Sequence, residues 1–119
     1  IQTRLVESAF TFAQTYNVVC VLKDFHTVTA IPYALGYLNL SGNHGMATGG
    51  SGDVLSGVIG AFLAQGLTAD VAAPLGVFVH GLAGDEAAKT TGKRALFSSD
   101  LIDGLSRVYD RADADGERF

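Results

Sequence analysis

The pattern of apolar and polar residues along this chain predicts a helix, then short strands, then further helices. Between residues 3 and 16 the apolar side chains recur every three or four positions, which indicates a helix with one buried face. Val18–Leu22 follows as a β-branched run with no polar interruption, which is typical of a parallel strand buried on both faces. Two more strands are expected over residues 27–31 and 37–40, with a turn at 32–36.

The remainder of the chain predicts helices. The stretch 52–65 has almost no polar side chains, so other elements should cover it. Thr68 can cap a helix that runs to about Lys89, and Ser98 or Ser99 can cap a last helix from Asp100 to about Tyr109. The charged residues 110–119 are expected to be a flexible tail.

Strands followed by helices, with no returning strands, would be unusual for a complete α/β domain. A strand that is apolar throughout also needs neighbours on both sides, and this chain offers few. We therefore expect residues 1–119 to be the carboxy-terminal portion of one domain whose sheet is completed elsewhere.

Composition narrows the classes of partner. The formal net charge is −4, 48% of the residues are hydrophobic and 17% are charged, so nucleic acid is not expected as a partner. The apolar stretch 54–64 is shorter than the roughly 20 residues that span a bilayer, so no membrane association is expected. Cys20 is the single cysteine, which suits a reducing cytoplasm. The apolar helices indicate self-association, and we expect a homo-oligomer.

The most informative segment runs from Asn43 to Asp53. Its glycine-rich part, Gly49-Gly50-Ser51-Gly52, opens the helix at 52–65 and so leaves backbone N–H groups without partners inside the helix. These donors and the helix dipole form an anion site. Asp53 can be a plain helix cap, or a general base that takes a proton from a hydroxyl beside the bound anion. Residue types alone leave both interpretations open.

A second candidate site follows the strand at Val18–Leu22. Ligands in open α/β sheets gather at the carboxyl ends of strands, where Lys23 offers a charge for phosphate and Thr27 a hydroxyl. From residue types alone, an exposed lysine on a turn is the commoner explanation. No spacing among His26, His80 and Asp85 fits a metal site held by the protein.

Gly42 to Leu55 reads Gly-Asn-His-Gly-Met-Ala-Thr-Gly-Gly-Ser-Gly-Asp-Val-Leu. This string resembles the motif Gly-Asn-Pro-Gly-Met-Ala-Thr-Gly-Gly-Thr-Gly-Asp-Val-Leu of the ADP/ATP-dependent NAD(P)H-hydrate dehydratases. These repair enzymes are related to the carboxy-terminal half of YjeF-type proteins and belong to the ribokinase-like superfamily. The chain departs from the motif at His44 and Ser51, of which the second keeps the hydroxyl.

The resemblance implies a ribokinase-like α/β fold, a parallel central sheet flanked by helices, of which this chain covers the carboxy-terminal part. It also implies that hydrated NADH or NADPH is dehydrated with ADP or ATP and Mg²⁺. Asp53 would be the catalytic base and contact the substrate, and Asn43 would contact the substrate as well. The nucleotide and its phosphates would be bound by Lys23, Asp24, Phe25, His26, Thr27, Gly49, Gly50, Ser51 and Gly52. Asp24 stands where the family has glycine.

The string His80-Gly81-Leu82-Ala83-Gly84-Asp85 also recurs in that family. We interpret His80 as a satisfied core histidine, the glycines as sites of close helix packing, and Asp85 with Glu86 as a solvated helix edge.

Three other functions stay open at this point. The chain could belong to a kinase of the same superfamily acting on a small alcohol such as a vitamin precursor, because the Gly-Gly-Ser-Gly-Asp core is shared. It could be a nucleotide-binding module without turnover, or an inactive truncated product.

Overall fold

The computed structural model describes residues 3–23, 26–32, 34–47, 49–94 and 96–114. The chain divides into two compact units, and each is described by itself below. The first unit comprises residues 1–40 and 59–77, and the second comprises residues 41–58 and 78–119.

The first unit begins with helix α1, Thr3–Tyr16, which has the bounds that the apolar spacing predicts. Asn17 ends it with a φ of 53°, the left-handed conformation that asparagine tolerates better than most residues. The N–H of Val18 donates to the carbonyl of Ala13 over 3.0 Å, which closes the helix with a Schellman hydrogen bond.

Strands β1 (Cys20–Leu22), β2 (Val28–Ala30) and β3 (Tyr37–Leu38) form an antiparallel sheet in the order β1-β2-β3 in the described part of the chain. Cys20 pairs with Ala30, so β1 and β2 form a hairpin. The expectation for Val18–Leu22 is thereby corrected, since its paired residues are antiparallel to β2 and half-buried. The connection between the two strands is too short for the crossover that a parallel pair requires.

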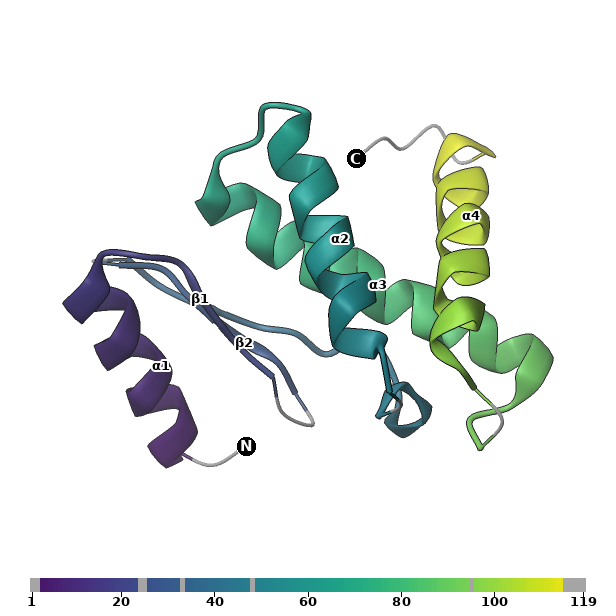
Figure 1. The fold of residues 1–119 in the computed structure, drawn as a ribbon, viewed down its shortest axis with the longest axis horizontal. Coiled ribbons are helices and arrows are strands. Elements are labelled where there is room, and N and C mark those ends of the chain that lie inside the picture. The colour runs from purple at the N-terminus through teal and green to yellow at the C-terminus, as the bar shows by residue number, and fades with distance from the viewer. Residues whose placement is uncertain (1–2, 24–25, 33, 48, 95, 115–119) are drawn as a thin grey trace. The chain divides into compact units, whose positions relative to one another are not determined.

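Helix α1 packs against β1 and β2, as Figure 1 shows on the purple side of the ribbon. The contact is made by small side chains, which let the helix approach the sheet closely, and the buried residues are Ala9, Ala13, Val28 and Ala30. Cys20 lies half-buried at the edge of this cluster, and its burial raises the pKa of its thiol.

Helices α2 (Ser51–Ala64) and α3 (Ala69–Thr91) each contribute to both units. In the first unit their adjoining halves are linked by a turn in which Gly66 has a φ of 97°. Phe62 is 2% exposed, and Gly76 packs so closely on Ile59 that a side-chain carbon at position 76 would clash. The following helix thus covers part of the apolar surface that the sequence predicts for the stretch 52–65.

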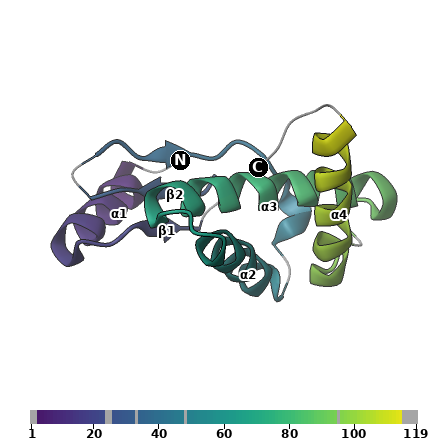
Figure 2. The ribbon, with the colours of Figure 1, turned by 90° about the horizontal axis from the view of Figure 1, so that it is seen from above.

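The second unit contains the short helix η1 (His44–Met46), the first half of α2, the second half of α3, and α4 (Ser98–Ala114). Figures 1 and 2 both show the yellow α4 crossing the green part of α3, and at this crossing Gly104 lies directly against the backbone of Ala83. The core of the unit is formed by Ala87, Leu96 and Leu101, with Met46, Val54 and Ala88 packed around it.

Helix α4 is longer than the sequence predicts at both ends. It includes residues 110–114, which were expected to be part of a flexible tail, and Ala112 is 6% exposed. The remaining residues of that expected tail, 115–119, lie outside the described residues. No helix in the described ranges is both long enough and apolar enough to cross a membrane.

Candidate functional site

The start of α2 has the geometry of an anion site. Its first helical hydrogen bond runs from the N–H of Val54 to the carbonyl of Gly50 over 3.1 Å. The N–H groups of Ser51, Gly52 and Asp53 stand ahead of that bond, where helix geometry leaves donors without a partner inside the helix. Gly50 has a φ of 87°, so the tight turn before the helix depends on glycine there. The predicted glycine turn and helix start are confirmed.

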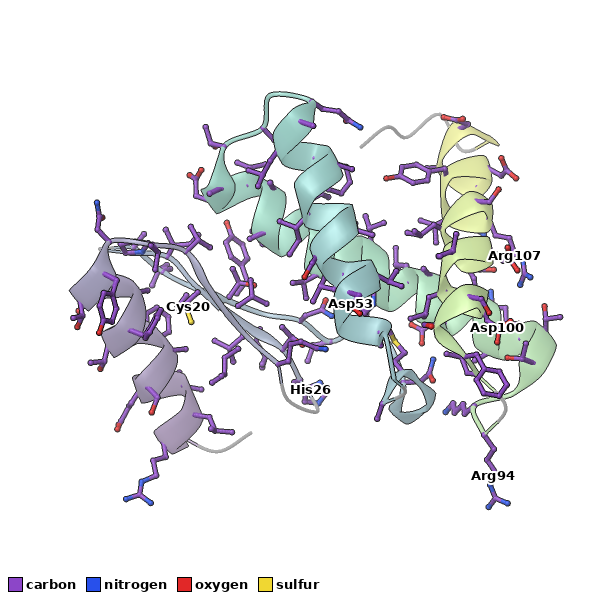
Figure 3. All side chains as sticks on the ribbon, viewed as in Figure 1. Cys20, His26, Asp53, Arg94, Asp100 and Arg107 are labelled. Atoms are coloured by element: carbon purple, nitrogen blue, oxygen red, sulfur yellow. The ribbon has the colours of Figure 1, made fainter. Side chains whose placement is uncertain are left out.

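The carboxylate of Asp53 belongs to the first turn of α2, and Figure 3 shows it near that end of the helix. Its side chain is exposed, so a reacting group can approach it. A carboxylate beside donors that attract anions can accept a proton from a hydroxyl whose oxygen is being phosphorylated.

Ser51, the first residue of α2, is hydrogen-bonded to His80 of α3. Nε2 of His80 lies 3.1 Å from the Ser51 carbonyl oxygen and 3.4 Å from Ser51 Oγ. A carbonyl can only accept, so the ring nitrogen donates to it. Ser51 is 4% exposed and His80 6%, and the interpretation of His80 as a satisfied core histidine is confirmed.

The loop before the glycine turn is built around Asn43. Its Oδ1 accepts from the N–H of Gly45 over 3.0 Å, which forms an Asx turn, and its backbone carbonyl accepts from the N–H of Met46 over 3.1 Å. Asp85 of α3 supplies the other partner, because its Oδ1 accepts from Asn43 Nδ2 and its Oδ2 accepts from the N–H of Gly42, each over 3.0 Å. The interpretation of Asp85 as a solvated helix edge is therefore wrong.

The small residues of α3 receive the same loop. Gly81 packs against Ser41, whose hydroxyl donates to the carbonyl of Phe78 over 3.1 Å, and Gly84 packs against Met46. A Cβ at either glycine would clash with the loop. The predicted role of these glycines in close packing is confirmed, and their neighbours are Ser41 of the loop and Met46 of the short helix η1.

The start of α4 also adjoins the glycine turn, because a Cβ built on Gly50 would lie 2.9 Å from Ser98 Oγ. The N–H of Phe97 donates to Asp100 Oδ2 over 2.8 Å, so the side chain that caps α4 comes from Asp100 and not from Ser98 or Ser99. Asp100 is labelled at this end of α4 in Figure 3.

A cluster of charges fastens α4 to α3. Glu86 is 8% exposed, and its Oε1 accepts from Lys89 Nζ over 2.8 Å and pairs with Arg111 of α4. The hydrogen bond from Lys89 and the nearby positive charges hold the pKa of Glu86 below its ordinary value. Arg107 donates to the Glu86 carbonyl and to Thr90 Oγ1. Glu86 is thus not on a solvated edge.

The residues predicted to bind the nucleotide after β1 belong to the first unit, whereas the loop and the glycine turn belong to the second. Lys23 is exposed, and His26 and Thr27 are half-buried. His26 lies in the connection between β1 and β2 in Figure 3. The Thr27 carbonyl accepts from the N–H of Asn39 over 2.9 Å. Asp24 and Phe25, which were also predicted to bind the nucleotide, lie outside the described residues.

Asp85 is the residue of this site that sequence reasoning missed. It binds a loop 42 and 43 positions away, and nothing local to residue 85 indicates that pairing. In the described ranges, no group of three or more His, Cys, Asp or Glu side chains is placed to hold a metal ion.

Several curated proteins are similar in sequence to this chain. The family model that describes NAD(P)H-hydrate dehydratase matches residues 1–107. A bifunctional NAD(P)H-hydrate repair enzyme of Moorella thermoacetica is 48% identical over 108 residues, which are 91% of this chain and 20% of that protein. An ADP-dependent (S)-NAD(P)H-hydrate dehydratase of Neisseria meningitidis is 46% identical over 77 residues, 65% of this chain and 26% of that protein. The chain therefore spans about a fifth to a quarter of these relatives.

A solved structure is similar as well. The ADP/ATP-dependent NAD(P)H-hydrate dehydratase of Bacillus subtilis, co-crystallised with ATP and Mg²⁺, matches with a TM-score of 0.83 and 33% identity. The match covers 92% of this chain and 39% of that chain. The fold class predicted from the sequence is confirmed, with this chain forming part of the fold.

Proposed function

Because the chain belongs to the NAD(P)H-hydrate dehydratase family, we propose that the protein carrying it repairs hydrated NADH or NADPH with consumption of ADP or ATP. One observation supports this most directly. An exposed carboxylate, Asp53, lies in the same helical turn as the N–H donors of Ser51 and Gly52. This turn combines a proton acceptor with an anion site, which a phosphorylation of a hydroxyl requires.

The chemistry proceeds in two steps. Asp53 takes the proton of the ring hydroxyl, and the hydroxyl oxygen attacks the terminal phosphoryl group of the nucleotide. The leaving group is AMP when the donor is ADP, and ADP when the donor is ATP. The carbon–oxygen bond of the phosphorylated ring then breaks, phosphate departs with the bonding electrons, and the neighbouring carbon loses a proton. Hydroxide is a poor leaving group and phosphate is a good one, which explains why a nucleotide is consumed.

The phosphates would be bound at the glycine turn, Gly49 to Gly52. Ser51 would take part through its backbone N–H, because its hydroxyl is buried beside His80. Lys23, Asp24, Phe25, His26 and Thr27 would bind the rest of the nucleotide. Mg²⁺ would arrive with the phosphates and neutralise their charge, as it commonly keeps its waters and binds through phosphate oxygens.

The proposal extends to location and assembly. We expect the protein in the cytoplasm, where its dinucleotide substrates and adenine nucleotides occur together. Its partners would be small molecules, with a second copy of itself as the expected protein partner.

The experiment uses the full-length protein that carries this sequence. It is incubated with hydrated NADH, Mg²⁺ and either ADP or ATP, and the return of the absorbance of reduced nicotinamide is followed. Asp53→Asn should lower kcat by about 10² to 10⁴, the usual contribution of a general base. Asp103→Asn, which changes an exposed carboxylate on α4, should leave kcat unchanged.

The outcomes separate the candidate functions. Recovery that depends on nucleotide and disappears in Asp53→Asn supports the proposal. A folded protein that shows no recovery with either nucleotide, but phosphorylates a small alcohol, would replace it with a kinase function. Nucleotide binding without turnover of any substrate would indicate a binding module.

A further inference from the structure

We propose that Asp85 is a positioning residue, which orients Asn43 toward the hydrated nicotinamide ring. The inference rests on the proposed function and deepens it, because it assigns the binding of hydrated NADH or NADPH to a hydrogen-bond network of this chain. Both oxygens of Asp85 are engaged, one by Asn43 Nδ2 and the other by the N–H of Gly42.

The network determines which way the Asn43 amide faces. Its Oδ1 accepts from the N–H of Gly45, and one Nδ2 hydrogen goes to Asp85, so neither end of the amide is free to rotate. The second Nδ2 hydrogen is left for another acceptor. A hydrated nicotinamide ring carries two suitable acceptors, the hydroxyl that is to be removed and the oxygen of its carboxamide.

The loop is also closely packed, so that a change in its hydrogen bonds must change the position of its residues. Gly42 has a φ of 97° and lies against Met46, which in turn packs on Gly84 of α3. Gly45 lies against the backbone of Lys93. Asn43 is therefore held between two closely packed points, and Asp85 is the side chain that joins the loop to α3 between them.

A carboxylate at position 85 is needed because the side chain must accept from two donors. In Asp85→Asn the side-chain amide has one oxygen for these two donors, so its NH₂ group faces either the NH₂ group of Asn43 or the N–H of Gly42. In either orientation two donors face each other, so the loop cannot keep both of the hydrogen bonds that hold Asn43 in place. The backbone change is small, so the variant tests orientation more than folding.

A reciprocal exchange restores every hydrogen bond. With Asn43→Asp and Asp85→Asn together, Asn at 85 accepts from Gly42 and donates to Asp at 43, whose other oxygen accepts from Gly45. The loop should then recover its order, but position 43 now offers an acceptor where the substrate needs a donor. This pair of variants separates holding the loop from orienting the donor.

Two measurements are made on the full-length protein. The first is steady-state kinetics with hydrated NADH and nucleotide varied separately. We expect Asp85→Asn to raise KM for hydrated NADH by about two- to tenfold, the effect of losing one hydrogen bond between Asn43 and a neutral acceptor on the ring, with KM for the nucleotide unchanged. A purely structural role would lower the active fraction, and so kcat, without moving one KM alone.

The second measurement is amide hydrogen exchange of residues 41–47, which needs no turnover. Asp85→Asn should expose this peptide to exchange, the reciprocal pair should protect it again, and Asp103→Asn should match the wild type. In the kinetic assay the reciprocal pair should still show the raised KM for hydrated NADH. If the reciprocal pair recovers both the protection and the wild-type KM for hydrated NADH, the proposal that Asp85 orients a donor on Asn43 is overturned.

The failures of the two proposals are distinguishable. A wild-type protein that does not dehydrate its substrate overturns the proposed function and the substrate role of Asn43 with it. An active wild type whose KM for hydrated NADH is unchanged by Asp85→Asn overturns the positioning role alone.

Discussion

Nε2 of His80 lies 3.1 Å from the backbone carbonyl oxygen of Ser51, and both residues are buried. His80 comes from the middle of α3, and Ser51 is the first residue of α2. A residue far along the chain thus holds the end of α2 at which the proposed reaction takes place.

Replacing His80 should therefore loosen the start of α2. We expect His80→Phe, which keeps an aromatic ring but removes the donor, to lower the free energy of unfolding by about 1–2 kcal/mol, as for a buried hydrogen bond broken on one side. His80→Gln keeps a side-chain N–H donor and should recover part of the loss. Denaturant unfolding of the three proteins measures this, and a Phe variant as stable as the wild type would contradict it.

The contact between Gly84 and Met46 predicts a clash. Gly84→Ala should lower the free energy of unfolding by about 1–3 kcal/mol, because the added methyl group meets the Met46 side chain in a closely packed region. Combining it with Met46→Ala should relieve the clash, so the two losses should not add.

A glycine in open space is the control for that variant. Gly57 on α2 is exposed, and nothing lies within 4 Å of a Cβ built there. Gly57→Ala should raise the free energy of unfolding by about 0.5–1 kcal/mol, since alanine favours a helix interior. Equal melting temperatures for Gly84→Ala and Gly57→Ala would show that the loop does not pack on α3 as described.

Substitutions at two neighbouring glycines should distinguish the residue that the backbone turn requires from the residue that a bound phosphate requires. Gly50→Ala places a side chain at a φ of 87° and beside Ser98, and should lower the free energy of unfolding by about 1–2 kcal/mol. Gly49→Ala has open space around it, so we expect unchanged stability but weaker nucleotide binding, because the methyl group limits the approach of a phosphate. Calorimetric titration with ADP and thermal unfolding together test the pair. Unweakened ADP binding by Gly49→Ala would place the phosphates elsewhere.

The helices could be predicted from the sequence because their signals are local. The spacing of apolar residues in α1, the glycine turn before α2 and the string at 80–85 each predict the nearby backbone, and the structure agrees with them. Local signals could also have corrected the strand at Val18–Leu22, since the short connection to β2 allows an antiparallel hairpin and no crossover.

Two other errors concern carboxylates whose partners lie far along the chain. Asp85 binds Gly42 and Asn43, which precede it by 43 and 42 positions, and Glu86 pairs with Arg111, 25 positions later. Neither spacing is a helical one, so both carboxylates resembled an ordinary polar edge. The same ion pair, with buried Ala112, keeps residues 110–114 helical, although their charged composition indicated a tail.

The Glu86 cluster predicts a dependence of stability on pH. The pKa of Glu86 is lowered from its ordinary value of 4.5, first because Lys89 donates a hydrogen bond and then because Arg111 is close. The folded state therefore favours the ionised carboxylate more than the unfolded state does. This stabilisation is fully present above pH 4.5 and is lost as the pH falls through the lowered pKa of the folded protein.

Glu86→Gln should consequently melt below the wild type at pH 7, and the gap between their melting temperatures should narrow as the pH is lowered beneath 4.5. Glu7→Gln is the matched control, because Glu7 is exposed on α1 and should show no such gap. Thermal unfolding of the three proteins from pH 7 to pH 3 measures the effect. A gap between wild type and Glu86→Gln that stays constant over this range would mean that the charge of Glu86 does not hold α4 against α3.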